Sequence, residues 1–142
     1  MTQMAKMIVG ALLIGGAVSS CSTSSEDLEK STSAVRSQKS YNENYQAVYR
    51  RLADTARRCQ STAGSAAFTV DAELYNELGY GEIALSMVSI YPRNYYWRAK
   101  IEKTGGGSRV SVVSGNTLVQ SRTLADVMRW ADGDPRCYAQ RA

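Results

Sequence analysis

The sequence predicts an α+β domain, in which two helices cover one face of a four-stranded antiparallel sheet. Near both ends of the domain, apolar residues recur every three or four positions, which is the spacing of an amphipathic helix. Between these helices, four segments alternate apolar and polar side chains and are joined by short connections. The expected order is therefore α-β-β-β-β-α, typical of an antiparallel sheet with its helices on one face.

The first helix is expected over residues 41–59. The residues Ser40-Tyr41-Asn42-Glu43 have the S-x-x-E form of a capping box, which begins a helix. Apolar side chains then follow at helical spacing and form a single stripe. The members of this stripe are Tyr41, Tyr45, Val48, Leu52, Ala56 and Cys59. Gly64 and the small polar residues around it predict a break.

Alternation predicts the first two strands, at residues 68–74 and 82–87, with a turn over residues 76–81 between them. Pro92 ends the second strand. A third strand is expected over residues 95–103, and Gly105-Gly106-Gly107 would connect it to a fourth that returns as a hairpin. In the third strand Trp97, Ala99 and Ile101 would face the core, and Tyr96, Arg98 and Lys100 the solvent.

The second helix is expected to begin at Thr123, whose side chain would cap it, and to place Asp126 in its first turn. Gly133, followed by Asp134-Pro135, ends it. Its apolar stripe consists of Leu124, Val127, Met128 and Ala131.

The first twenty residues have the features of a signal peptide: Lys6, an apolar run over residues 7–18, and small residues before Cys21. The run is shorter than the roughly twenty residues that span a bilayer. The sequence Val18-Ser19-Ser20-Cys21 resembles the lipobox of bacterial lipoproteins. That resemblance implies cleavage after residue 20 and lipidation of Cys21. The alternative is an ordinary secretory signal, for which an Ala-x-Ala site is missing.

Residues 21–40 are expected to be the lipidated Cys21 and a flexible Ser-rich tether. This stretch has almost no large apolar side chains, so it cannot bury enough surface to offset its ordering entropy. The globular domain would then occupy residues 41–142. In a Gram-negative host, Ser22 resembles the residue that permits export to the outer membrane, where the domain would face the periplasm. A Gram-positive host would place it on the outer face of the plasma membrane.

With Cys21 assigned to lipid, Cys59 and Cys137 remain. An even pair in an exported chain predicts a disulfide. Two buried free thiols or a redox pair are the alternatives, although the chain has no C-x-x-C sequence that would favour thiol exchange.

Charge and composition argue against several function classes. The net charge is +4, and loss of Lys6, the only charged residue of the first twenty, lowers it to +3, which is no signature of nucleic-acid binding. Histidine, the commonest general base and neutral metal ligand, is absent. Glu73, Glu77 and Glu82 could supply paired carboxylates for glycan cleavage, but nothing in the sequence specifies which two would converge. No catalytic activity, metal or cofactor is expected.

One segment, Gly79-Tyr80-Gly81-Glu82-Ile83-Ala84, matches the G-x-G-x-x-A pattern of dinucleotide-binding turns. That motif must open a helix within a βαβ unit. Because strands are expected here, the pattern does not indicate nucleotide binding.

Two groups of side chains are candidates for a ligand or partner surface. Arg50, Arg51, Arg57 and Arg58 could clamp phosphate groups, or could form helix-surface ion pairs with Asp54. The aromatic residues near Tyr91–Trp97, together with Tyr75 and Tyr80, could stack on glycan rings, with Tyr96 and Arg98 as the exposed members. The alternative is that these aromatic residues serve strand pairing alone.

The pattern from Tyr45-Gln46-Ala47-Val48-Tyr49 through Arg57-Arg58-Cys59 resembles small uncharacterised lipoproteins of Gram-negative bacteria. That resemblance implies an envelope location and no particular activity. We expect a non-catalytic domain that binds an envelope protein partner, as an assembly accessory or structural element. The fold outline also resembles small domains of outer-membrane assembly lipoproteins. The alternative function is a module that binds peptidoglycan or an anionic glycolipid.

Overall fold

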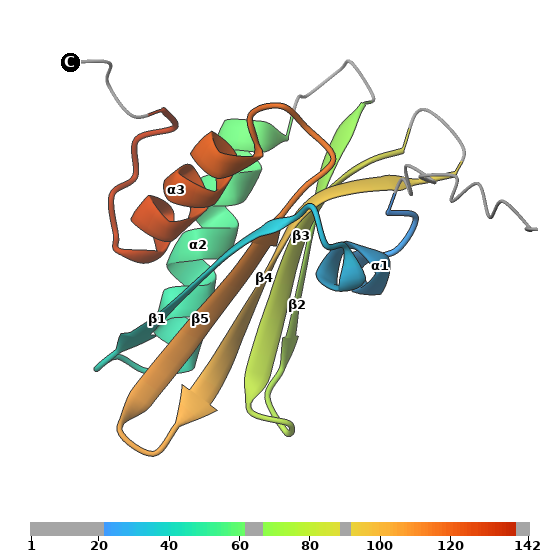
Figure 1. The fold of residues 1–142 in the computed structure, drawn as a ribbon. Helices are drawn as coiled ribbons and strands as arrows, with labels where there is room; N and C mark the ends of the chain where they lie inside the picture. The colour runs from blue at the N-terminus through green and yellow to red at the C-terminus, as the bar shows by residue number, and fades with distance from the viewer. Residues whose placement is uncertain (1–21, 62–66, 89–91, 139–142) are drawn as a thin grey trace, which may run out of the picture.

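The computed structural model describes residues 22–61, 67–88 and 92–138. It confirms the α+β class and the antiparallel sheet. Two long helices cover one face of the sheet, and a short helix lies on the other (Figure 1). The elements in chain order are α1 (Ser25–Lys30), β1 (Val35–Tyr41), α2 (Tyr45–Gln60), β2 (Phe68–Tyr75), β3 (Tyr80–Met87), β4 (Asn94–Thr104), β5 (Gly107–Ser114) and α3 (Gln120–Ala131). The strand order is β1-β5-β4-β3-β2, and each neighbouring pair is antiparallel.

The expectation of four strands and two helices was wrong, because the described residues form one more strand and one more helix. The additional helix α1 and all of the additional strand β1 except Tyr41 lie within residues 22–40, which were expected to form a flexible tether. Leu28 of α1 is fully buried, and β1 pairs with β5 along its whole length. Because β1 is held by backbone hydrogen bonds at the sheet edge, it does not need large apolar side chains. The folded domain therefore includes Ser22 onwards, whereas Cys21 and the expected signal peptide lie outside the described residues.

The first expected helix, α2, begins at Tyr45 rather than at residue 41. Asn44 caps it, since its side-chain oxygen accepts a hydrogen bond from the backbone N–H of Gln46 at 2.8 Å. The S-x-x-E sequence at residues 40–43 is not a capping box, because Ser40 and Tyr41 end β1. A strand and its turn therefore take the place of the first expected helical turn.

The four predicted strands are confirmed, and their alternation places the core correctly. Trp97, Ala99 and Ile101 of β4 are fully buried between the sheet and the two long helices. The β4–β5 hairpin turns at Gly105 and Gly106, as the sequence indicated. The other large buried side chains of this core are Tyr45, Val48, Leu52, Val70, Ile83, Leu85, Val110, Val112, Val127 and Trp130.

The last helix, α3, begins at Gln120, three residues before the expected cap at Thr123. Val119 is its N-cap and makes no side-chain capping bond. Asp126 is therefore not in the first turn; it is largely buried and pairs with Arg129 at 2.9 Å. The helix ends as predicted, with Gly133 at a φ of 98°, where glycine is favoured.

A β-bulge in β4 changes which side chains face the solvent. Leu85 of β3 lies opposite Trp97, and the next residue, Ser86, lies opposite Tyr95, so Tyr96 is an extra residue without a partner. Tyr96 packs against the core beneath the long helices, with its ring centroid 5.5 Å from that of Phe68. The expectation that Tyr96 and Arg98 share the exposed face was wrong, because the bulge breaks the period of two.

The structure contains the expected disulfide between Cys59 and Cys137. It joins the last turn of α2 to the segment after α3, with the two Cα atoms 5.1 Å apart. The bridge closes a loop with a sequence separation of 78 residues, which contains β2 to β5 and α3.

Candidate functional site: the open face of the sheet

We call the sheet surface that faces away from α2 and α3 the open face. The strand registers place its side chains in three rows that run across all five strands. From β2 to β1, the first row is Asp71, Ala84, Arg98, Val113 and Arg36, the second is Glu73, Glu82, Lys100, Ser111 and Gln38, and the third is Tyr75, Tyr80, Glu102, Arg109 and Ser40. An antiparallel sheet with one solvated face has this polar character.

The short helix α1 lies across one end of the open face. A capping box begins it: the Ser24 side chain accepts a hydrogen bond from the backbone N–H of Asp27, and the Asp27 carboxylate accepts one from the Ser24 N–H. Leu28 anchors the helix in a small second core with Ala34, Val113 and Tyr95. The helix packs on β4 and β5, so it leaves a hollow on either side.

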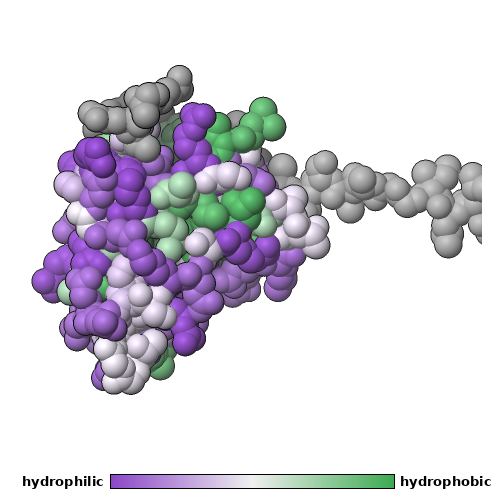
Figure 2. All heavy atoms as spheres, turned by 60° about the vertical axis from the view of Figure 1, so that its left-hand side comes forward, coloured by the Kyte–Doolittle hydropathy of each residue, from purple (hydrophilic) through white to green (hydrophobic). Residues whose placement is uncertain are grey.

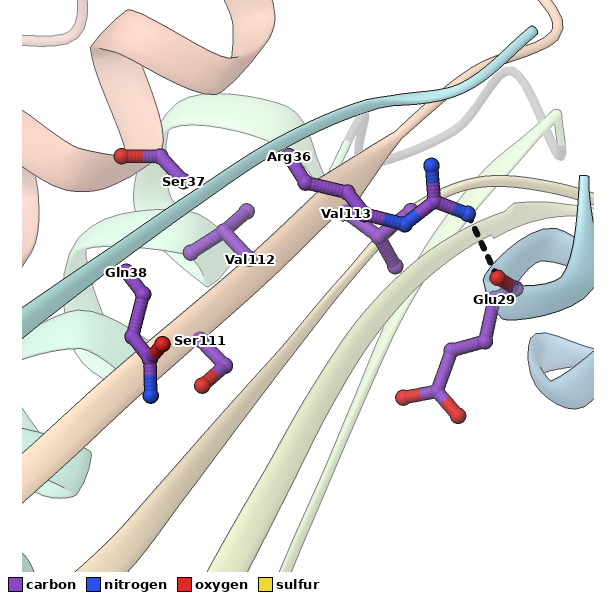
Figure 3. A pocket seen from close by; sticks show the side chains of 7 residues that line it. All are labelled: Glu29, Arg36, Ser37, Gln38, Ser111, Val112 and Val113. Carbon is purple, nitrogen blue, oxygen red and sulfur yellow. Dashed lines mark hydrogen bonds between the residues drawn. The ribbon is translucent and has the colours of Figure 1, made fainter. Parts of the chain in front are cut away.

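The β1 hollow lies between α1 and the β1–β5 edge of the sheet and has a volume of about 500 Å³ (Figure 3). Its lining residues are Glu29, Arg36, Ser37, Gln38, Ser111, Val112 and Val113. Buried Val113 forms part of its floor, and Gln38 and Arg36 are exposed at its rim. The Arg36 guanidinium is fixed because it donates to the backbone carbonyls of Glu29 at 2.5 Å, Ser31 at 2.8 Å and Ala34 at 2.9 Å.

The β2 hollow lies on the other side of α1 and has a volume of about 330 Å³. Ion pairs organise it. Arg93 pairs with Asp71, while Arg98 pairs with Glu82 and, at 2.6 Å, with Glu29 of α1. The Arg98 side chain is only 11% exposed, and its Nε has no hydrogen-bond partner. Arg98 therefore links α1 to the sheet, and it is not a free ligand-binding group.

An acidic and aromatic surface borders the β2 hollow. Glu73 is exposed, lies directly opposite Glu82, and takes part in none of the ion pairs of the described residues. It accepts a hydrogen bond from the hydroxyl of Tyr75, which raises the pKa of Tyr75 to about 12. The rings of Tyr75 and Tyr80 are 4.9 Å apart, and the Lys100 ammonium lies 4.9 Å from the Tyr80 ring centroid.

The four candidate arginines of α2 do not form one cluster. Arg51 pairs with Glu43 and donates to the carbonyl of Ala131 at 2.8 Å. Arg58 donates to the carbonyl of Pro135 at 2.5 Å. These two side chains tie α2 to the end of α3 and the segment beyond it. Arg50, Arg57 and Arg58 are exposed.

The expected ion pairs between Asp54 and the neighbouring arginines are absent from the described part of the chain. The four arginines therefore form neither a phosphate clamp nor helix-surface ion pairs with Asp54. Arg50 and Arg57 remain as separate exposed charges on α2.

The structure clarifies the remaining sequence motifs. Gly79 is in a turn with a φ of 72°, and Tyr80–Met87 is a strand, so the G-x-G-x-x-A pattern opens no helix. Of the three carboxylates that could serve glycan cleavage, Glu73 and Glu82 lie opposite each other, and Glu77 is in the turn. Within residues 22–61, 67–88 and 92–138, no cluster of three or more acidic, Cys or His side chains could hold a metal ion. None of the helices in those ranges is long and apolar enough to cross a membrane.

Sequence reasoning missed the residues that α1 and β1 contribute to this site. Glu29, Arg36 and Gln38 belong to the stretch interpreted as a tether. Two signals in the sequence were Leu28, an isolated large apolar residue in a polar segment, and the S-x-x-D sequence of the capping box at Ser24–Asp27. Leu28 is fully buried, so this segment is part of the folded domain.

Comparisons with known proteins give no identity. No family model matches this chain, and no curated protein matches it significantly. A solved structure that resembles it is protein CV1439 from Chromobacterium violaceum, with 9% sequence identity and a TM-score of 0.33. The similarity covers 74% of this chain and 95% of that one, and it is too weak to inform the function.

Proposed function

We propose that this chain is a non-catalytic envelope lipoprotein, anchored through Cys21, whose open face binds a protein partner. The β1 hollow is the observation that supports the partner site. It combines an apolar floor at Val113 with polar groups at its rim, the arrangement of residues at protein interfaces. The strands that carry these groups make the surface rigid, which lowers the ordering cost of binding.

The edge strand beside this hollow suggests how a partner would bind. β1 is the last strand of the sheet and pairs with β5 on one side only. An extended segment of a partner could add to the other side through main-chain hydrogen bonds. Its neighbouring side chains would then lie near Gln38 and Arg36. In a Gram-negative host we propose that the domain faces the periplasm from the outer membrane.

A second candidate function is peptidoglycan binding at the β2 hollow. The Tyr75–Tyr80 pair offers aromatic surface for sugar rings, and Glu73 offers a carboxylate for their hydroxyl or amino groups. An anionic glycolipid fits this surface less well, because Arg93 and Arg98 are already paired with carboxylates.

The anchor is tested by growing cells with a clickable fatty acid. The wild-type chain should be labelled, and the Cys21→Ala variant should not. Equal labelling of the two chains would exclude lipidation at Cys21.

The partner surface is tested by placing a photocrosslinking amino acid at Gln38 or Ser111 in living cells. One partner adduct of a single size should form at both positions. Arg57, exposed on α2, is the control position and should give no such adduct. The same adduct at all three positions, or none at Gln38 and Ser111, would contradict the proposed surface.

The second candidate needs a separate measurement. The variants Tyr80→Ala and Glu73→Gln should weaken retention on isolated peptidoglycan if the β2 hollow binds glycan. Unchanged retention in both variants would rule out this candidate.

A further inference from the structure

The described fold begins directly after the proposed lipid attachment residue. Ser22 is 1% exposed, and its backbone carbonyl accepts a hydrogen bond from the backbone N–H of Tyr95 at 3.1 Å. α1 starts three residues later, at Ser25. Consecutive Cα atoms are about 3.8 Å apart, so Cys21 has no length of free chain between it and the folded domain. A lipid on Cys21 would therefore hold the domain close to the bilayer.

The loop between β5 and α3 is fixed beside this attachment point. The side-chain amide of Asn116 donates to the backbone carbonyl of Tyr95 at 2.8 Å, so Tyr95 contacts Ser22 through its N–H and this loop through its carbonyl. The N–H of Gly115 donates to the carbonyl of Tyr96 at 2.9 Å. The loop is thus held to β4 by three hydrogen bonds, the third of which runs from the side-chain amide of Asn116 to the side-chain oxygen of Asn94 at 3.2 Å.

This loop exposes two apolar side chains near Ser22. Leu118 is 106% exposed and Val119 is 47% exposed. Leu118 is two residues from Asn116, a span of at most about 7 Å of extended chain. These side chains are therefore close to the position from which a lipid on Cys21 would extend.

A further exposed apolar side chain, Val88, lies at the same end of the molecule as Leu118 and Val119. Val88, after the end of β3, is 48% exposed. Figure 1 places the β5–α3 loop at the upper end, where β3 ends, opposite the β2–β3 and β4–β5 hairpins. Figure 2 shows hydrophobic atoms that project at this upper end. We call this end of the domain, with Ser22, Val88, Leu118 and Val119, the anchor end.

We propose that the anchor end lies directly on the lipid surface, with Leu118 inserted between the headgroups. This inference rests on the proposed lipidation of Cys21. The acyl chains would bring the anchor end to the bilayer, and transfer of Leu118 and Val119 out of water is then favourable. Because hydrogen bonds already hold the loop, little ordering is needed for this contact. Arg122, exposed in the first turn of α3, could then meet a lipid phosphate.

This orientation would place the two hairpins away from the membrane and both hollows of the open face close to it. The hollows flank α1, which begins three residues after Ser22. A partner would therefore be met near the bilayer surface.

The experiment uses the full-length lipidated protein in vesicles of phosphatidylethanolamine and phosphatidylglycerol. A photocrosslinking amino acid replaces Leu118 in one variant and Leu78 in the other. Leu78 is the matched control, because it is 69% exposed in the β2–β3 turn, at the opposite end of the sheet. After irradiation, mass spectrometry should find lipid adducts at position 118 several-fold more often than at position 78. Intact mass establishes whether each variant carries lipid on Cys21.

The outcomes separate this inference from the proposed anchor. A lipidated protein without adducts at position 118, or with equal adducts at both positions, overturns the orientation and leaves the anchor standing. A protein that carries no lipid on Cys21 overturns both. Both substituted positions are exposed, so neither variant should disturb folding, which circular dichroism checks.

Discussion

The backbone N–H of Tyr95 donates to the carbonyl of Ser22, and this bond attaches the start of the domain to the sheet. The β-bulge makes this contact possible. Because Tyr96 is the extra residue that turns towards the long helices, Tyr95 is left on the open face, where it packs beside Leu28. A single additional residue in β4 thus serves both the main core and the contact with the N-terminal segment.

Leu28 should contribute strongly to stability, although it lies in a segment with the composition of a linker. It is fully buried against Ala34 and Val113. Leu28→Ala should therefore lower the free energy of unfolding by about 2–4 kcal/mol, measured by urea denaturation of residues 22–142. Leu78→Ala removes an exposed leucine and should change it by less than about 0.5 kcal/mol. Equal effects of the two substitutions would mean that α1 is not packed on the sheet.

Strands β2 to β5 could be predicted because each has one buried and one solvated face. The resulting alternation placed Trp97 and Ile101 in the core correctly. β1 could not be predicted in this way. It is an edge strand, and on its helix side Tyr41 packs against the main core while Lys39 pairs with Asp132 at the end of α3. A strand with so few apolar side chains does not alternate clearly, and its composition is that of a disordered segment.

The candidate site was harder to predict, because it depends on contacts between residues distant in sequence. The partner of Arg51 on α3 is the carbonyl of Ala131, 80 residues away. Periodicity alone could not reveal that the Arg51 guanidinium is already hydrogen-bonded within the protein. It also could not locate the bulge that removes Tyr96 from the exposed face, because one inserted residue reverses the alternation that follows.

Gly107 should be the one glycine of the Gly105-Gly106-Gly107 turn that cannot be replaced. A Cβ at residue 107 would lie 2.0 Å from the carbonyl oxygen of Tyr41, whereas at Gly105 and Gly106 it would meet nothing within 4 Å. Gly107→Ala must push β1 and β5 apart where their pairing begins. We expect it to cost about 1–3 kcal/mol of stability.

The two preceding glycines provide the matched controls for this substitution. Gly105→Ala and Gly106→Ala should be neutral, or stabilising by up to about 1 kcal/mol, because alanine restricts the unfolded chain. Thermal and urea denaturation of the three variants test the contrast. A Gly107→Ala variant as stable as the other two would contradict the close approach of Tyr41.

Stability should depend on pH through Asp132, at the end of α3. Burial acts to raise the pKa of Asp132, but hydrogen bonds from Lys39 at 2.7 Å and Tyr41 at 2.7 Å outweigh it, so the pKa is lowered from 3.8. A carboxyl whose pKa is lower in the folded state stabilises the fold above its unfolded pKa. That contribution disappears as the pH falls through the folded pKa.

The comparison of the wild type with Asp132→Asn tests this dependence. At neutral pH the wild type should be more stable, by no more than about 1 kcal/mol because the pair is partly exposed. This difference should shrink as the pH falls from about 5 to about 3. Asp54→Asn, which changes an exposed carboxylate on α2, is the control and should have little effect. A difference that grows on acidification would contradict the assignment.

The disulfide between Cys59 and Cys137 should make a large contribution to stability. It closes a loop with a sequence separation of 78 residues, and the chain-entropy relation for such a loop gives about 4.5 kcal/mol. The double variant Cys59→Ala with Cys137→Ala should lose about this amount in urea denaturation, since its unfolded chain is less restricted. Cys21→Ser, studied in the chain without the signal peptide, is the control and should match the wild type, because Cys21 is outside the bridge. Alkylation of both Cys59 and Cys137 without a reductant, or equal denaturation midpoints for the wild type and the double variant, would show that the bridge does not stabilise the protein.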